Sequence, residues 1–129
     1  MEKFEITVAS ETEVEITSED IDDIMVGALE GGIIYWCRKV EVIGEYLGEY
    51  ASDQISRGGE LKFYCVDERD PYVLTRDKLL NGVEKLIENG SKELLENGEE
   101  TFRISMYQLD ACACDAIIQY ALFDEIVYG

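Results

Sequence analysis

The segment that decides the fold runs from Ile21 to Gly59 and reads IDDIMVGALEGGIIYWCRKVEVIGEYLGEYASDQISRGG. It contains the only tryptophan, three of the eight tyrosines and a long apolar run. Its first part places apolar side chains at the three- and four-residue spacing of a helix with one buried face. Glycine pairs then mark the ends of elements. We therefore expect this segment to supply the centre of the core and part of any specialised surface.

The residues before this segment predict a strand hairpin that leads into the first helix. Apolar and polar side chains alternate over residues 3–8 and 13–16, as in half-buried strands. Thr17 or Ser18 stands where a helix N-cap belongs, and acidic residues follow it at the positive end of the helix dipole. The helix should therefore begin here and end at the glycine pair Gly31-Gly32.

The same signals divide the rest of the chain into short elements. Continuous apolar residues from Ile33 are typical of a buried strand, and N-cap residues precede two amphipathic patterns further on. In chain order, the patterns predict a strand over 33–43, a short helix over 50–56, a hairpin of strands 61–66 and 72–75, a helix from Thr75 to Asn89, a surface turn over 91–100, a strand over 101–107 and a last helix capped by Asp110.

Composition predicts one compact domain. At 129 residues and 47% apolar content, the chain can bury a core without disulfides or metal, and it lacks the low hydrophobicity of disordered proteins. Strand hairpins and helices without regular β–α–β alternation indicate an α+β fold. We expect antiparallel strand hairpins packed with about three amphipathic helices in a single domain over residues 1–129.

Residue usage argues against an enzyme or a metalloprotein. The chain has no histidine, which is the commonest general base and a usual zinc ligand. On a helix Cys112 and Cys114 diverge by about 200°, a poor geometry for zinc, and the acids of residues 67–70 lack the order of a calcium loop. No leader or membrane span is evident, so we expect a cytoplasmic protein without cofactor, whose four cysteines are reduced, buried apolar residues.

Negative charge is the strongest functional clue. The 11 basic residues against 29 acidic ones give a net charge of −18, more than solubility requires. Carboxylates two residues apart on a strand lie about 6.8 Å apart, which is on the scale of phosphate spacing along a nucleic acid. The sequence thus suggests a row that imitates nucleic acid toward a basic groove. It consists of Glu5, Glu13, Glu15, Glu19, Asp20, Asp22 and Asp23.

A solvated face with favourable helix-dipole interactions is the simpler explanation of these acids. Four other acids, Glu93, Glu96, Glu99 and Glu100, belong to the expected surface turn and lie outside the proposed row. They would serve as the control for net charge.

Aromatic and glycine residues offer a second hypothesis, a sponge that sequesters a nucleotide immune signal. Aromatic rings could stack on a base while backbone amides of an SRGG segment hold a phosphate. The competing explanation is that the aromatics belong to the core, where we expect Trp36, and that SRGG ends a helix. The residues of this alternative site are Tyr35, Trp36, Tyr46, Tyr50, Ser56, Arg57, Gly58 and Gly59.

Four segments resemble small acidic proteins carried by phages and other mobile elements of Firmicutes: IDDIMVGALEGGIIYWC, EYLGEYASDQISRGG, LTRDKLLNGVEKLIENG and DAIIQYALFDEIVYG. The resemblance implies a protein that disarms host defence. Together with the charge, it leads us to expect a non-enzymatic inhibitor of a nucleic-acid-handling defence effector, of the anti-CRISPR or anti-restriction type. Its partner would be a basic groove of that effector, with no direct binding to nucleic acid or membrane. A structural or regulatory protein whose charge only maintains solubility is the third alternative.

Overall fold

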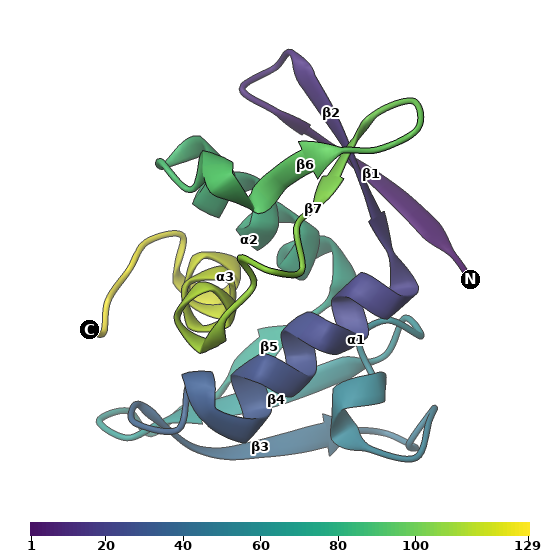
Figure 1. The fold of residues 1–129 in the computed structure, drawn as a ribbon. Coiled ribbons are helices and arrows are strands. Elements are labelled where there is room, and N and C mark those ends of the chain that lie inside the picture. The colour runs from purple at the N-terminus through teal and green to yellow at the C-terminus, as the bar shows by residue number, and fades with distance from the viewer.

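The computed structural model describes all 129 residues as one α+β domain, in which three helices occupy the space between two sheets (Figure 1). One sheet has four strands in the order β1-β2-β7-β6, and the other has three in the order β3-β4-β5. The strands are β1 Lys3–Val8, β2 Thr12–Thr17, β3 Cys37–Ile43, β4 Glu60–Cys65, β5 Tyr72–Leu74, β6 Leu95–Asn97 and β7 Phe102–Ile104, and the helices are α1 Ser18–Gly27, α2 Arg76–Glu88 and α3 Ala111–Phe123.

The N-terminal hairpin and α1 form as the alternation and the N-cap signal predict. β1 and β2 pair antiparallel, with Ile6 opposite Val14 on the buried side. Thr17 is the N-cap of α1: its hydroxyl accepts from the amide of Asp20, whose carboxylate accepts in turn from the amide of Thr17. This capping box satisfies two backbone donors at the start of the helix. After α1 the chain continues as a π-helical turn, Ala28–Gly32.

The prediction of a strand from Ile33 is wrong for its first four residues. Residues 33–36 form a helical turn in which the amides of Trp36 and Cys37 both donate to the carbonyl of Ile33. Consequently Ile33 and Trp36 are buried, whereas the two side chains between them are exposed. The sequence alone cannot distinguish this turn from a strand, because a continuous apolar run has no alternation of apolar and polar residues from which a period could be read. The strand β3 begins only at Cys37.

The predictions of a second hairpin, of a helix after Thr75 and of a last helix capped by Asp110 are confirmed. β4 pairs antiparallel with both β3 and β5. Thr75 and Asp110 cap α2 and α3, and the two helices pack against each other. The predicted helix over 50–56 is only a single 3₁₀ turn, Ala51–Asp53, followed by further turns.

The pairing of β7 determines where the candidate site lies. The surface segment predicted over 91–100 contains a 3₁₀ turn, Lys92–Leu94, and then β6, which pairs antiparallel with β7. β7 is shorter than the predicted strand over 101–107 and pairs parallel with β2. A hairpin from late in the chain is thereby joined to the N-terminal hairpin.

One apolar core connects both sheets and all three helices, and it contains 26 buried residues. Trp36 is fully buried within it, as expected. All four cysteines are free thiols, but Cys112 is exposed rather than buried, because it points away from the core on α3. The C-terminal tail is docked: the amides of Val127 and Tyr128 both donate to the side-chain oxygen of Gln119.

Candidate functional site

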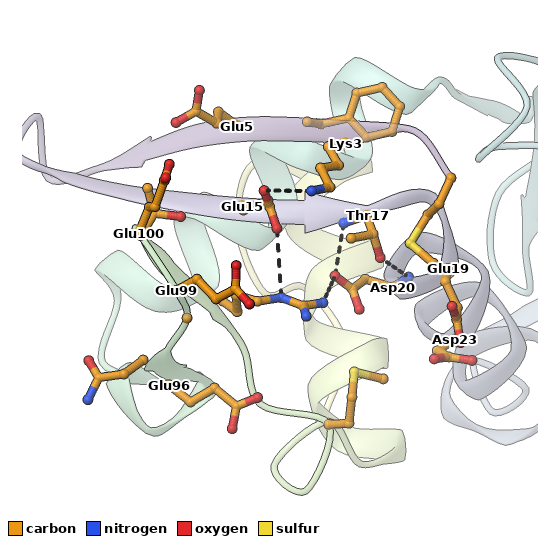
Figure 2. Close-up of a pocket in the computed structure, with 17 residues that line it drawn as sticks. Lys3, Glu5, Glu15, Thr17, Glu19, Asp20, Asp23, Glu96, Glu99 and Glu100 are labelled. Atoms are coloured by element: carbon orange, nitrogen blue, oxygen red, sulfur yellow. Dashed lines mark hydrogen bonds and ion pairs between the residues drawn. The ribbon is translucent and has the colours of Figure 1, made fainter.

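The outward face of the four-stranded sheet borders a cleft of about 1090 Å³, and eight of the 17 residues that line it are acidic (Figure 2). Its lining contains eight carboxylates and only two basic side chains, Lys3 and Arg103, which leaves a side-chain charge of −6. Three segments contribute the acids: the β1–β2 hairpin, the first turns of α1 and the β6–β7 hairpin. The eight are Glu5, Glu15, Glu19, Asp20, Asp23, Glu96, Glu99 and Glu100.

Strand register arranges four of the lining side chains as a row across the sheet. Glu5 lies opposite Glu15, Glu15 opposite Arg103, and Arg103 opposite Glu96. Neighbouring strands are about 4.8 Å apart. The row therefore crosses the strands. The spacing of Glu13 and Glu15 in the sequence had instead suggested a row along one strand.

Arg103 is the cation at the centre of the cleft. Its Nη2 lies 3.4 Å from Oδ2 of Asp20, and its Nε lies 4.0 Å from Oε2 of Glu15. The Nε atom is buried and has no hydrogen-bond partner. Lys3 approaches the other oxygen of Glu15 at 3.8 Å. These contacts neutralise only part of the charge of the cleft.

The acids at the start of α1 have different roles within the cleft. Asp20 is only 4% exposed and is occupied by the capping box and by Arg103. Asp23 is one turn further along the helix, where burial and then the charges of Glu19, Asp20 and Asp22 raise the pKa of its carboxyl. The fold thus makes ionisation of Asp23 less favourable than in the unfolded chain, as expected where like charges are concentrated.

Most of the predicted acidic residues do line this cleft, but two do not. Asp22 faces the other side of α1, where its carboxylate accepts from the hydroxyl of Ser56. Glu13 is exposed and lies opposite Thr7, outside the cleft. The remaining five, Glu5, Glu15, Glu19, Asp20 and Asp23, are brought together by the β1–β2 hairpin and α1.

Sequence reasoning missed Arg103 and the acids of the β6–β7 hairpin. Glu96, Glu99 and Glu100, which had been set apart as controls, lie in the same cleft because β7 pairs with β2. A local signal was present: Asn97-Gly98 between two short apolar stretches is typical of a hairpin turn. No local pattern, however, indicates that the hairpin joins β2.

The structure does not assemble the aromatic residues of the alternative nucleotide site. Tyr35 precedes β3, whereas Tyr46 and Tyr50 follow it, so the seven residues of the strand separate them by roughly 20 Å. Trp36 is fully buried, stacks on Tyr128 at 5.3 Å and donates to Asp115 at 2.7 Å, so it has no free face for a base. A joint stacking platform is therefore absent.

The SRGG segment is also committed to the fold. The amide of Gly58 donates to Ile55 and the amide of Gly59 to Gln54, so neither is free to hold a phosphate. Arg57 is exposed, and its guanidinium lies against Gly48 in the loop that follows β3. This segment consists of turns before β4, and it does not end a helix as the simpler explanation proposed, because the predicted helix is only the 3₁₀ turn Ala51–Asp53.

Comparison of the chain with protein-family models, curated proteins and solved structures gave no match. No helix is both long enough and apolar enough to cross a membrane. No three His, Cys, Asp or Glu side chains are grouped in a way that could hold a metal ion. The acidic cleft is therefore the feature from which a function can be argued.

Proposed function

We propose that this protein is a non-enzymatic inhibitor that binds a basic element of a nucleic-acid-handling defence effector in its acidic cleft. The observation that carries the proposal is the lining of eight carboxylates against two basic side chains. A basic element of the effector that normally contacts phosphates would contact these carboxylates instead, and the effector would no longer bind nucleic acid. The site of action is the cytoplasm of a bacterial host, and the inhibitor is of the anti-CRISPR or anti-restriction type.

The form of the cleft favours a protruding cationic element. The sequence suggested a partner with a basic groove, but a concave acidic surface is better matched by a basic helix or loop that enters it. A volume of about 1090 Å³ exceeds the needs of a single side chain. Only three lining residues are hydrophobic, Met1, Phe4 and Met106, so recognition depends on charge and hydrogen bonding.

The overall charge of −18 supports a protein partner over nucleic acid itself. A field of this sign repels phosphates and attracts basic proteins, and it speeds their encounter at low salt. The resemblance to small acidic proteins of mobile elements supports a target in host defence. Inhibition would require only binding, which agrees with a chain that contains no histidine.

Two variants with equal charge can test the proposal. In the cleft variant, four exposed carboxylates are changed to the amides: Glu5→Gln, Glu96→Gln, Glu99→Gln and Glu100→Gln. In the control variant, four exposed acids outside the cleft are changed in the same way: Glu11→Gln, Glu30→Gln, Glu49→Gln and Glu93→Gln. None of these eight side chains makes a hydrogen bond or ion pair, so both variants should fold.

The readout is phage survival in hosts that carry individual nuclease-based restriction or CRISPR systems. Wild type should protect phage against at least one system, the control should retain protection, and the cleft variant should lose it. With that effector purified, binding should compete with its nucleic acid and weaken as salt rises, mainly through the association rate. If both variants lose protection equally, the effect depends only on total charge and not on the cleft. If wild type itself protects phage against none of the systems, the proposal is refuted.

A further inference from the structure

A second hollow, of about 530 Å³, lies between the β4–β5 turn, the end of α3 and the C-terminal tail. It shares no lining residue with the acidic cleft. Its eight lining residues are of two kinds only, apolar or aromatic side chains and carboxylates, with no lysine or arginine among them. They are Asp67, Glu68, Tyr72, Leu122, Phe123, Glu125, Val127 and Tyr128.

Three aromatic rings form the wall of this hollow. Tyr72 meets Phe123 edge to face, with ring centroids 4.7 Å apart at 85°, and Phe123 meets Tyr128 at 5.9 Å and 63°. Behind them, Tyr128 stacks on the buried ring of Trp36. Because the rings support one another in fixed orientations, their half-exposed surfaces form a preorganised wall.

The carboxylates are held at the rim by the same tyrosines. The hydroxyl of Tyr128 donates to Asp67 at 2.6 Å, and that of Tyr72 donates to Glu68 at 2.9 Å. These hydrogen bonds raise the pKa of both tyrosines, so the hydroxyls stay protonated and keep donating at neutral pH. Neither these two carboxylates nor Glu125 makes an ion pair within the protein. Three carboxylates, without a cation to balance them, thus line the same hollow as the three aromatic rings.

We propose that this hollow, formed by Tyr72, Phe123 and Tyr128 with three carboxylates at its rim, binds a small organic cation of the quaternary ammonium class. Aromatic faces attract cations through the ring quadrupole, most strongly where water is excluded. The volume is in the range of small-molecule pockets, roughly 300–1,000 Å³. A quaternary ammonium needs no hydrogen bonds, which suits Asp67 and Glu68, whose carboxylates already accept from tyrosines.

The rim also determines which ammonium compounds fit. A ligand with a phosphate or carboxylate close to its ammonium group would bring that anion against Asp67, Glu68 or Glu125. The site should therefore prefer a cation with net positive charge, such as choline, over phosphocholine or a phosphocholine lipid headgroup. A neutral molecule of the same shape would gain the apolar contacts but neither the cation–π attraction nor the Coulomb attraction.

The test is titration of the purified protein with tetramethylammonium, choline, phosphocholine and the neutral choline isostere 3,3-dimethylbutan-1-ol, followed by NMR. Tetramethylammonium and choline should shift resonances of Tyr72, Phe123 and Tyr128 in a saturable way. The isostere and phosphocholine should bind at least about tenfold more weakly, the factor that corresponds to 1.4 kcal/mol. Equal binding of choline and its isostere, or no saturable shift with either cation, would overturn the proposal.

Matched variants locate the site. Tyr72→Leu removes one wall and should weaken choline binding several-fold, whereas Tyr107→Leu changes a tyrosine that is 97% exposed outside the hollow and should not. Since Tyr72→Leu also alters packing, Glu125→Gln provides a second variant that removes charge from an exposed rim position. It should weaken choline binding without affecting the isostere, and Glu93→Gln is its control. Unchanged affinity in both Tyr72→Leu and Glu125→Gln would place binding elsewhere and contradict the proposal.

Discussion

Trp36 shows how one side chain connects distant parts of this chain. Its indole nitrogen donates to Asp115 on α3, and the same carboxylate oxygen accepts from Gln119. Gln119 in turn accepts from two amides of the C-terminal tail, and Tyr128 of that tail stacks on the indole. Residues 79 positions apart are thereby fixed to each other, and the tail becomes part of the core.

The first prediction concerns this residue. Trp36→Ala should lower the free energy of unfolding by about 3–5 kcal/mol, because the substitution removes a fully buried ring and leaves a cavity. Denaturant unfolding of wild type and variant measures the difference. Tyr107→Ala, at a position 97% exposed, is the control and should stay within about 0.5 kcal/mol of wild type. A cost below about 1 kcal/mol for Trp36→Ala would contradict the burial described above.

Asp23 illustrates the cost of concentrating charge. Burial and its acidic neighbours raise the pKa of this carboxyl above its ordinary value of 3.8. In the unfolded chain the group releases its proton at lower pH, so the folded state binds more protons between the two pKa values. Stability is therefore lost as pH rises through the folded-state pKa.

The second prediction follows from that sign. Asp23→Asn should raise the melting temperature at pH 7, because the amide carries no charge to repel its neighbours, and the gain should disappear below about pH 3.8. Thermal melts at several pH values test this, with Glu93→Gln as an exposed control. If Asp23→Asn is less stable at pH 7, the carboxylate has a stabilising partner that outweighs the repulsion.

At the scale of elements, the contact between α2 and α3 depends on a missing side chain. A Cβ atom at Gly82 would lie 2.4 Å from the carbonyl oxygen of Ile117 and 3.1 Å from the Cβ of Ala121. Since the nearest atom belongs to the backbone, it cannot move aside alone. The two helices approach this closely only because residue 82 is glycine.

The third prediction sets packing against helix propensity. Alanine is favoured over glycine in a helix by about 1 kcal/mol, yet Gly82→Ala should destabilise the protein by roughly 1–3 kcal/mol, because the helices must separate. Its control is Asn81→Ala, the exposed neighbour in the same helix, which should be neutral or slightly stabilising. Denaturant unfolding of both variants measures the contrast, and stabilisation by Gly82→Ala would show that the helices can adjust without cost.

Local patterns predict most elements of this fold but not how they meet. Caps at Thr17, Thr75 and Asp110 and the apolar faces of the helices are visible in the sequence, because they act within a few residues. The turn at 33–36 is not, since four consecutive apolar residues fit several conformations. The parallel pairing of β2 with β7 depends on contacts across the whole chain.

The same limits apply to predicting the candidate site from the sequence. Five of its acids belong to the β1–β2 hairpin and α1, which are contiguous in sequence and could be predicted together. Glu96, Glu99 and Glu100 could not be assigned to it without the pairing of β7, and neither could Arg103. Residues of a site that come from one supersecondary unit are thus predictable, and those that arrive through long-range pairing are not.

At the scale of the whole molecule, the charge is distributed unevenly. Residues 31–78 carry nine acids and seven bases, whereas the segments on either side carry ten acids each with one and three bases. Sheet β3-β4-β5 lies in the balanced segment, and its outward face alternates Lys39 and Lys62 with acids. The acidic cleft lies on the other sheet. Self-repulsion is therefore concentrated where the proposed partner would bind, and a basic partner would relieve it.

The last prediction measures that repulsion without any partner. Sodium chloride screens like charges, so raising it from about 0.02 to 0.5 M should increase the melting temperature, and about 1 kcal/mol of relieved repulsion corresponds to roughly 4 °C in a domain of this size. The variant with Glu5, Glu96, Glu99 and Glu100 changed to glutamine should melt higher than wild type at low salt. The variant changed at Glu11, Glu30, Glu49 and Glu93 removes as much charge from dispersed positions and should gain less. At high salt the two should converge. Equal gains at low salt would mean that the repulsion is spread over the whole surface, and the cleft would then lose its standing as an electrostatically strained site built for a cationic partner.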